Sequence, residues 1–315
     1  MSMSAKEKKG RGRRIGPRTD AARPNTAGAA ARATEREHHS HRDTSRRSAA
    51  EEKLAKISGL AAVRAVFQRD PDRILRLYYS ERAKGAAGPL CAKLAEMRRI
   101  YRLVSDEELA RIAGTVLHGG IVAAVRHRDV QRFDTEVAEG WARSGDPLVV
   151  LDGVGNPHNL GAIARTLAFF GIPRLLLSGH PAQAGLSDAA YRVAEGGLEY
   201  LEIFATAHLP SDLTVIRDSY RVIGTALRRG RPLAALPPDP RPICLVLGNE
   251  EEGLPTATVR ACEALVTISG SGAVQSLNVA ATAAILVSEI VGSIGQRRTA
   301  RARAIRPRDR GRVKK

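Results

Sequence analysis

The stretch NLGAIART (159–166) places Asn159 six residues before Arg165, with Gly161 between them. An amide can fix a hydroxyl or a phosphate by hydrogen bonds, and a guanidinium can hold an anionic group with two parallel bonds. Asn159 stands where a helix N-cap would, Gly161 permits close backbone approach, and Arg165 lies within the second helical turn. The same spacing also suits a plain cap followed by a solvated charge, so this stretch alone leaves both interpretations open.

A second polar loop, GNEEEG (248–253), follows the apolar run ICLVLG (243–248). Three consecutive carboxylates repel one another at neutral pH. These carboxylates could pair with a cation or bind an amine or hydroxyl group of a ligand. They also fit the simpler role of acidic charge before the next helix. Alone, this loop indicates no single chemistry.

A third loop, ISGSGAVQSLNV (268–279), leads into a long aliphatic run and places Ser276 and Asn278 at a helix mouth. The free backbone N–H groups there can hold a polar ligand. Gly270 and Gly272 approach a dinucleotide-binding fingerprint, but Gln275 occupies the place of the third glycine. Only one helix follows, which leaves little room for the rest of a dinucleotide domain and disfavours that interpretation. The chain also has no GxxxxGK[ST] motif and no Ser/His/Asp or Cys/His arrangement.

The elements that carry these loops alternate between strand and helix, which predicts a parallel sheet covered on both faces. Strands are expected at 147–154, 174–179, 201–204, 221–227, 243–248 and 265–269. Helices are expected at 159–171, 187–197, 209–220, near 255–262 and from about 276 to 293. Ligands of open parallel sheets bind beyond the carboxyl ends of strands, where the three loops lie.

An α/β unit of about 75 residues precedes this sheet. Leu54, Ile57, Leu60, Val63, Val66 and Phe67 recur at helical intervals and predict a helix. The pattern then predicts strands at 74–79 and 119–127, a helix running into a strand at 90–103, and a helix at 106–114. Residues 127–146 read as a polar linker with room for a short helix, and they place a domain boundary near 145. Trp141 in this linker can stack on a base, although packing against a domain surface is the commoner fate of a single Trp.

Charge separates the ends of this 315-residue chain from its middle. The net charge is +8 over 1–50 and +9 over 297–315, which accounts for the whole +17 of the chain. Such basic tails suit a polyanion, so RNA is the expected partner, with solubilising disorder as the alternative. No apolar run is long enough for a membrane span, and no secretory signal is present. Cys91, Cys244 and Cys262 lack metal-ligand spacing and predict buried free thiols in a reducing cytoplasm, without a metal site.

Taken together, N-x-G-x-x-x-R, L-G-N-E-x-x-G and S-L-N-V resemble the SpoU (TrmH-like) family of RNA ribose 2′-O-methyltransferases, within the SPOUT superfamily. The resemblance covers roughly 147–293, and residues 54–126 resemble the small substrate-binding domain of many members. It implies an α/β fold with a C-terminal parallel-sheet domain tied in a deep trefoil knot, preceded by a small α/β RNA-binding domain. The expected parts are a disordered basic extension (1–50), the RNA-binding domain (51–128), a linker (129–146), the catalytic domain (147–296) and a basic tail (297–315).

The resemblance also implies a homodimer through the knot, S-adenosylmethionine (AdoMet) as the methyl donor, and ribosomal or transfer RNA as the substrate. Residues that match the family's catalytic or substrate-positioning residues are Asn159, Arg165, Glu250, Ser276 and Asn278. Residues expected to bind the cofactor are Thr225, Ala226, Leu227, Leu247, Gly248, Asn249, Ile268, Ser276 and Leu277. The third loop departs from the family pattern, with Ser269–Gly270 in place of Pro-Met and Gln275 in place of Glu.

Methyl transfer to a ribose hydroxyl needs positioning and removal of one proton, because the sulfonium already activates the methyl group. A neutral guanidine is costly, so our hypothesis is that Arg165 clamps the neighbouring phosphate and stabilises the developing alkoxide. Asn159, Ser276 and Asn278 would fix groups by hydrogen bonds, and Glu250 would orient Arg165 or Asn159. The rival interpretation is a non-catalytic RNA-binding or ribosome-assembly factor on the same fold.

Overall fold

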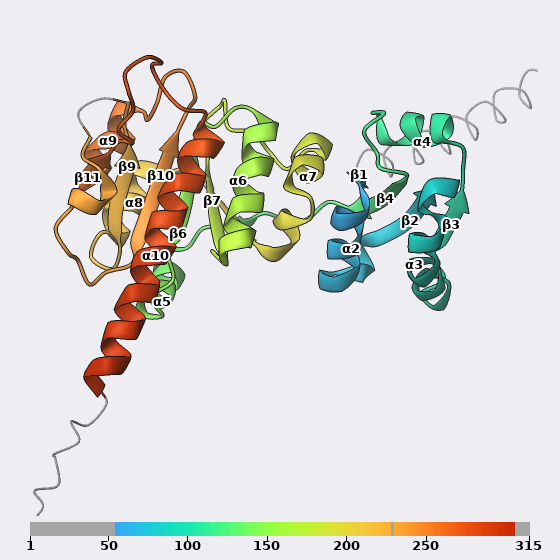
Figure 1. Ribbon diagram of the computed structural model, residues 1–315, viewed down its shortest axis with the longest axis horizontal. Helices are drawn as coiled ribbons and strands as arrows, with labels where there is room; N and C mark the ends of the chain where they lie inside the picture. The colour runs from blue at the N-terminus through green and yellow to red at the C-terminus, as the bar shows by residue number, and fades with distance from the viewer. Residues whose placement is uncertain (1–53, 228–229, 306–315) are drawn as a thin grey trace, which may run out of the picture. The chain divides into compact units, whose positions relative to one another are not determined.

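A seven-stranded sheet carries the C-terminal part of the chain in the computed structural model, which describes residues 54–227 and 230–305 (Figure 1). The strands run in the spatial order β11-β9-β10-β6-β7-β8-β5, and every neighbouring pair is parallel. They are β5 (Gln131–Arg132), β6 (Leu148–Asp152), β7 (Arg174–Ser178), β8 (Glu202–Thr206), β9 (Arg221–Thr225), β10 (Ile243–Gly248) and β11 (Ala264–Val266). The predicted parallel sheet is confirmed.

Helices cover both faces of this sheet, as the sequence predicts. They are α5 (Thr135–Arg143), α6 (Pro157–Phe170), α7 (Asp188–Ala194), α8 (Leu209–Ile216), α9 (Thr256–Ala261) and α10 (Val279–Ile305). Along β6, Val149 and Leu151 face a core that includes α6, α7 and α10, whereas Leu148 and Val150 face α5, α8 and α9. Both faces of the strand are therefore buried, which explains its unbroken apolar sequence.

The preceding unit is a four-stranded mixed sheet in the order β1-β4-β2-β3. Its elements are β1 (Leu54–Ser58), α2 (Leu60–Arg69), β2 (Ile74–Tyr79), α3 (Lys84–Glu96), β3 (Ile100–Leu103), α4 (Asp106–Ala113) and β4 (Ile121–Arg126). The first unit also contains two short 3₁₀ helices, η1 (Pro71–Arg73) and η2 (Glu81–Ala83). Two more, η3 (Gly197–Tyr200) and η4 (Leu233–Ala235), lie in the part of the chain that forms the larger sheet.

The prediction of a helix from Leu54 onward is wrong, because residues 54–58 form strand β1. Ala55 and Ile57 point into the core and β1 pairs antiparallel with β4, so its alternation has a period of two. The helix begins only at Leu60. A three-residue spacing between Leu54 and Ile57 fits both periods over so short a segment.

Contacts join the two sheets, and the described residues all belong to one compact unit. The buried guanidinium of Arg73 donates to Glu199 Oε2 at 2.6 Å, and the backbone N–H of Lys56 donates to Asp188 at 2.8 Å. Arg128 donates to the carbonyl of Leu198 at 2.6 Å. The segment around η3 therefore anchors the first sheet to the second.

The expected linker belongs to the larger sheet over much of its length. Strand β5 pairs with β8, and α5 packs against one face of the larger sheet. The chain therefore joins that sheet before residue 145. The Trp141 ring lies 4.8 Å from the Phe204 ring at an interplanar angle of 48°, and the Arg174 guanidinium lies 4.6 Å above the Trp141 ring. Of the two roles considered for Trp141, the structure therefore shows packing inside the domain.

At the other end of the chain, helix α10 continues through Ile305, into the segment expected to be a tail. The expected extension over 1–50 and the last ten residues of the expected tail lie outside the described residues.

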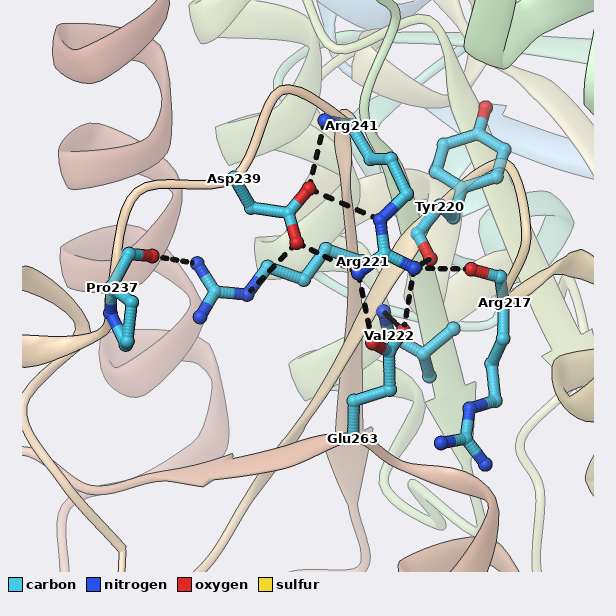
Figure 2. Close-up of polar contacts among 8 residues, drawn as sticks. All are labelled: Arg217, Tyr220, Arg221, Val222, Pro237, Asp239, Arg241 and Glu263. Carbon is cyan, nitrogen blue, oxygen red and sulfur yellow. Dashed lines mark hydrogen bonds and ion pairs between the residues drawn. The ribbon is translucent and has the colours of Figure 1, made fainter.

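The connection between β9 and β10 is fastened by a cluster around Arg241 (Figure 2). Its guanidinium donates to Asp239 Oδ2 at 2.7 Å and to Glu263 Oε2 at 2.9 Å, and it also binds the carbonyl of Arg217. Glu263 directly precedes β11. The cluster therefore holds the end of this connection against the segment that enters β11.

Strand β11 lies between β9 and a residue of the same connection. The N–H of Ala226 donates to Val266 on one side, and Arg231 exchanges bonds with Leu265 and Thr267 on the other. This pairing holds the first part of the β9–β10 connection against both sides of β11. The trefoil knot itself stays a prediction.

Candidate functional site

The three polar loops lie together at the carboxyl ends of the strands of the larger sheet. Strand β6 lies at the centre, with β7 and β8 on one side and β10, β9 and β11 on the other. Gly248 at the end of β10 pairs with Asp152 at the end of β6, so the loops that follow these strands start side by side. The order of strands reverses at this point, where open parallel sheets bind their ligands.

A chain of hydrogen bonds links three of the five predicted catalytic residues. The amide of Asn159 donates to Glu250 Oε1 at 2.6 Å, and the amide of Asn278 donates to Asn159 Oδ1 at 2.9 Å. The second carboxylate oxygen of Glu250 accepts from the N–H of Gly155 at 3.3 Å. Each of the three side chains follows a different strand, so only the fold brings them together.

Two helix starts differ from those predicted. The N-cap of α6 is Asn156, whose side chain accepts from His158 N–H at 2.9 Å, and Asn159 lies in the first turn with its side chain buried. Helix α10 starts at Val279, and the Asn278 side chain caps it by accepting from Ala280 N–H at 2.8 Å. Asn159 is therefore free of the capping role, and Asn278 combines it with the bond to Asn159.

A cavity of about 310 Å³ opens beside this network. Eight of the nine predicted cofactor residues line it: Thr225, Ala226, Leu227, Gly248, Asn249, Ile268, Ser276 and Leu277. Leu247 does not, because its side chain is fully buried in β10. The predicted catalytic residue Glu250 also lines the cavity, so the network and the cavity share a wall.

Ten further residues line the cavity, and none of them is among the predicted cofactor-binding residues. They are Glu252, Gly253, Leu254, Val259, Val266, Thr267, Gln275, Val279, Thr282 and Leu286. Val259, Val266, Val279 and Leu286 are apolar residues of strands and helices, which the pattern assigns to the core. Glu252, Gly253 and Gln275 belong to the predicted polar loops, and Gln275 marks the departure from the family pattern.

Arg165 stands apart from the network in the described structure. Its guanidinium pairs with Glu195 at 3.0 Å, and both side chains are more than half exposed. Of the two residues that Glu250 was expected to orient, Asn159 is the one that it contacts, and the orienting role stays a prediction. Arg165 keeps its charge accessible to an anionic partner.

Close packing behind the site explains Gly161, where the sequence predicts close backbone approach. A Cβ at this position would lie 2.5 Å from the carbonyl oxygen of Ala190 in α7. Any side chain there would push α7 away from α6. The prediction for Gly161 is confirmed.

The thiols near the sheet are suited to packing rather than to chemistry. All three cysteines are free, and Cys244 is fully buried. Burial raises the pKa of Cys262 to about 12 and that of Cys244 well above its ordinary value. Both thiols therefore stay protonated near neutral pH and are poor nucleophiles.

Within the described residues, His, Cys, Asp and Glu nowhere form a group of three that could hold a metal ion. None of the helices in the described part of the chain combines the length and apolarity of a membrane span.

Comparisons with known proteins match both parts of the chain. Residues 146–288 match the model of the SpoU rRNA Methylase family, and residues 56–130 match the model for RNA 2′-O ribose methyltransferase substrate binding. The chain is 32% identical to an uncharacterized tRNA/rRNA methyltransferase, YfiF, of Escherichia coli O157:H7, over 78% of this chain and 69% of that protein. It is 31% identical to the 23S rRNA (guanosine-2′-O-)-methyltransferase RlmB of Nitrosomonas europaea, over 76% of this chain and 92% of that protein.

Among solved structures, the fold resembles the AdoMet-bound rRNA methyltransferase from Sinorhizobium meliloti. The TM-score is 0.61 at 22% identity, over 76% of this chain and 87% of that chain. Sequence relatives, both family models and the fold agree with the motifs in the three loops. The chain belongs to the SpoU family and is an AdoMet-dependent RNA 2′-O-ribose methyltransferase.

Proposed function

We propose that this methyltransferase acts on ribosomal RNA and that the Asn159–Glu250–Asn278 network holds the target ribose at the mouth of the cavity. The observation that carries the proposal is the position of Glu250, which lines the cavity and also receives the Asn159 hydrogen bond. Relatives named as 23S rRNA methyltransferases, such as RlmB of Nitrosomonas europaea, support ribosomal over transfer RNA.

AdoMet would occupy the cavity. A volume of about 310 Å³ lies at the lower end of the range of about 300–1,000 Å³ for small-molecule sites. Apolar residues such as Ile268 and Leu254 suit the adenine ring, and the polar groups of Asn249 and Ser276 suit the remainder of the cofactor. Bound there, AdoMet supplies an activated methyl group.

The chain's own residues would supply orientation and charge. Asn159 and Asn278 are fixed by each other and by Glu250, so they meet the ribose without reorganising. Arg165 would exchange its exposed partner Glu195 for a substrate phosphate, because phosphate accepts two parallel bonds from a guanidinium. The positive charge then stabilises the alkoxide that forms as the hydroxyl gives its proton to solvent water.

A homodimer through the catalytic domain is part of this proposal. Helices α6 and α10 pack against each other and expose Phe169, at 83%, and Ile285, at 38%, to solvent. Large apolar side chains on adjacent helices favour a protein partner, and a second copy would cover them. Both subunits would then shape the site.

The first sheet would recruit the RNA, in keeping with the substrate-binding model that matches residues 56–130. The basic terminal segments would add affinity that is indifferent to sequence and falls with salt. An enzyme that modifies ribosomal RNA would work in the cytoplasm.

The deciding experiment maps 2′-O-methyl groups in the ribosomal and transfer RNA of a strain that lacks the gene. One site in ribosomal RNA is expected to lose its methyl group and to regain it with the wild-type gene, but not with Glu250→Gln. Loss of a site in transfer RNA alone would move the substrate to that RNA. If both RNAs keep every site and AdoMet does not bind at millimolar concentration, the chain is a non-catalytic RNA-binding factor.

A further inference from the structure

The loop that follows β7 places one amide side chain against the site, and it belongs to none of the three polar loops. Gln183 Oε1 accepts from the N–H groups of Gly153 and Val154, each at 3.1 Å. Its Nε2 donates to the carbonyls of Val154 at 3.2 Å and Ala184 at 3.1 Å. A side-chain amide has two acceptor and two donor positions, and here all four are used.

The backbone that Gln183 binds is the turn from β6 into α6, residues 153–155. The loop around Gln183 touches this turn at two further points. Ala184 N–H donates to the Val154 carbonyl at 2.9 Å, and a Cβ at Gly155 would lie only 3.1 Å from the Ala182 carbonyl. The side chain therefore joins two loops that are already in contact.

The same turn supports the residues that follow β10. Gly155 N–H donates to Glu250 Oε2 at 3.3 Å, and Gly153 O accepts from the Asn249 amide at 2.7 Å. Glu250 in turn receives the Asn159 bond at 2.6 Å. A shift of the turn would move the Glu250 carboxylate and the start of the helix that carries Asn159.

We infer that Gln183 is a positioning residue for methyl transfer, which acts through turn 153–155 on Glu250 and Asn159. The inference rests on the proposed function. Gln183 has no hydrogen-bonding position left for RNA, and it is absent from the cavity wall. Its contribution reaches the substrate only through the groups that it orients.

Gln183→Met tests this, because methionine keeps the length of the side chain and removes all four hydrogen bonds. The kcat is expected to fall by about tenfold to a hundredfold, as for a small misplacement of reacting groups. The KM for AdoMet should change less than about threefold, since Asn249 is also fixed by paired backbone bonds to Gly253. Gln131→Met, at an exposed position in β5, is the matched control and should keep the wild-type kcat.

A double-mutant cycle with Glu250→Gln separates positioning from plain stabilisation. If Gln183 acts through Glu250, adding Gln183→Met to Glu250→Gln should lower kcat by less than about twofold more. A wild-type kcat in Gln183→Met, or a full additional loss in the double variant, would overturn the inference. Gln183→Glu, which keeps the acceptor for both N–H groups, replaces Gln183→Met in the cycle if the latter does not fold.

The wild type run beside these variants keeps two failures distinct. If the wild type and Gln131→Met methylate RNA equally and Gln183→Met matches them, only the role of Gln183 is overturned. If the wild type itself transfers no methyl group to ribosomal RNA, the proposed function fails, and the positioning role fails with it.

Discussion

Asn159 and Glu250 lie 91 positions apart in the chain and are joined by a hydrogen bond of 2.6 Å. One carboxylate oxygen of Glu250 accepts a hydrogen bond from the Asn159 amide, and the other accepts one from a backbone N–H in the turn after β6. Glu250 therefore ties the loop after β10 to the loop after β6. The amide oxygen of Asn159 accepts a hydrogen bond from Asn278. Each side chain in the network therefore has one defined donor or acceptor role toward its neighbour.

Replacing Asn278 by Asp separates the cap of α10 from the network. Aspartate keeps the acceptor for Ala280 N–H and caps a helix as well as asparagine does, so the free energy of unfolding should fall by no more than about 1–3 kcal/mol, the cost of the lost bond to Asn159. It loses the donor to Asn159 and sets a charge against that amide oxygen. We expect kcat to fall by about tenfold or more.

Single-turnover methylation and thermal unfolding check this prediction together. Asn156→Asp, which makes the same exchange at the cap of α6, is the control and should retain kcat. Equal kcat in both variants would mean that the bond from Asn278 to Asn159 has no part in the reaction.

Arg165→Lys should impair turnover while leaving stability almost unchanged. The pair with Glu195 is exposed on both sides, so its loss should change the free energy of unfolding by less than about 1 kcal/mol. Lysine keeps the charge but cannot make two parallel bonds to phosphate. Turnover on the natural RNA is expected to drop by at least about tenfold.

Steady-state kinetics with Glu195→Gln as the control test this role of Arg165. The control frees the guanidinium and should keep or raise the activity. Near wild-type turnover of Arg165→Lys would exclude a bidentate contact.

Much of the larger sheet could be predicted from sequence because a doubly covered parallel strand must be apolar throughout. The runs around Val149 and Leu245 are short, apolar throughout and flanked by Pro and Gly or Asp, which favours a buried strand over a helix. Strand β1 could not be predicted, because Leu54 and Ile57 satisfy helical spacing as well as alternation. Only its pairing with β4 decides between the two periods.

For the site, the sequence was enough to predict which residues of the motif loops take part, but not which residues they contact. Glu250 had two candidate partners in the sequence, and the fold selects Asn159. Gln183 gives no signal at all, because one glutamine in a Pro- and Gly-containing loop has no period and no motif. Its four bonds exist only because the loops after β6 and β7 lie together.

Phe169→Glu should split the proposed homodimer. Phe169 is 83% exposed on α6, which packs against α10, and a charge there would have to be desolvated in an interface. Light scattering of the wild type should give twice the chain mass of 33.8 kDa, and that of the variant should approach the single mass.

Val215→Glu is the control for this experiment, since Val215 is also exposed, at 52%, but lies on α8 at the other face of the sheet. A wild type that is monomeric at micromolar concentration, or a Phe169→Glu variant that stays dimeric, would contradict an interface at α6 and α10.

The buried pair of Arg73 and Glu199 should matter more for stability than any exposed pair. Both side chains are under a tenth exposed, so Glu199→Ala leaves a buried guanidinium without its charge partner. Unfolding in urea should show a loss of about 3–5 kcal/mol. Replacing both residues with methionine should recover much of the loss, because no buried charge is then left.

Glu81→Ala is the comparison for this pair, because its partner Lys84 is 60% exposed. Its loss should stay within about 0.5 kcal/mol. Equal losses for Glu81→Ala and Glu199→Ala would show that Arg73 and Glu199 are hydrated in solution.

The Asp239–Arg241 pair should make stability fall in acid. Hydrogen bonds from Arg241 hold the pKa of Asp239 at about 2, below its ordinary value of 3.8. A folded-state pKa below the unfolded one means that the unfolded chain binds the proton first. The contribution of Asp239 is therefore complete above about pH 4 and is lost as pH falls through about 2.

Asp239→Asn removes this dependence while keeping the size of the side chain. At pH 7 the variant should be less stable by about 2 kcal/mol, which is the energy of a pKa shift of that size. Near pH 2 it should approach the wild type, because Asp239 is then about half protonated in the folded chain and almost fully protonated in the unfolded chain, so most of its contribution is lost. Urea unfolding from pH 7 to pH 2 measures the difference. A gap that stays constant over this range would mean that the carboxylate charge does not stabilise the connection between β9 and β10.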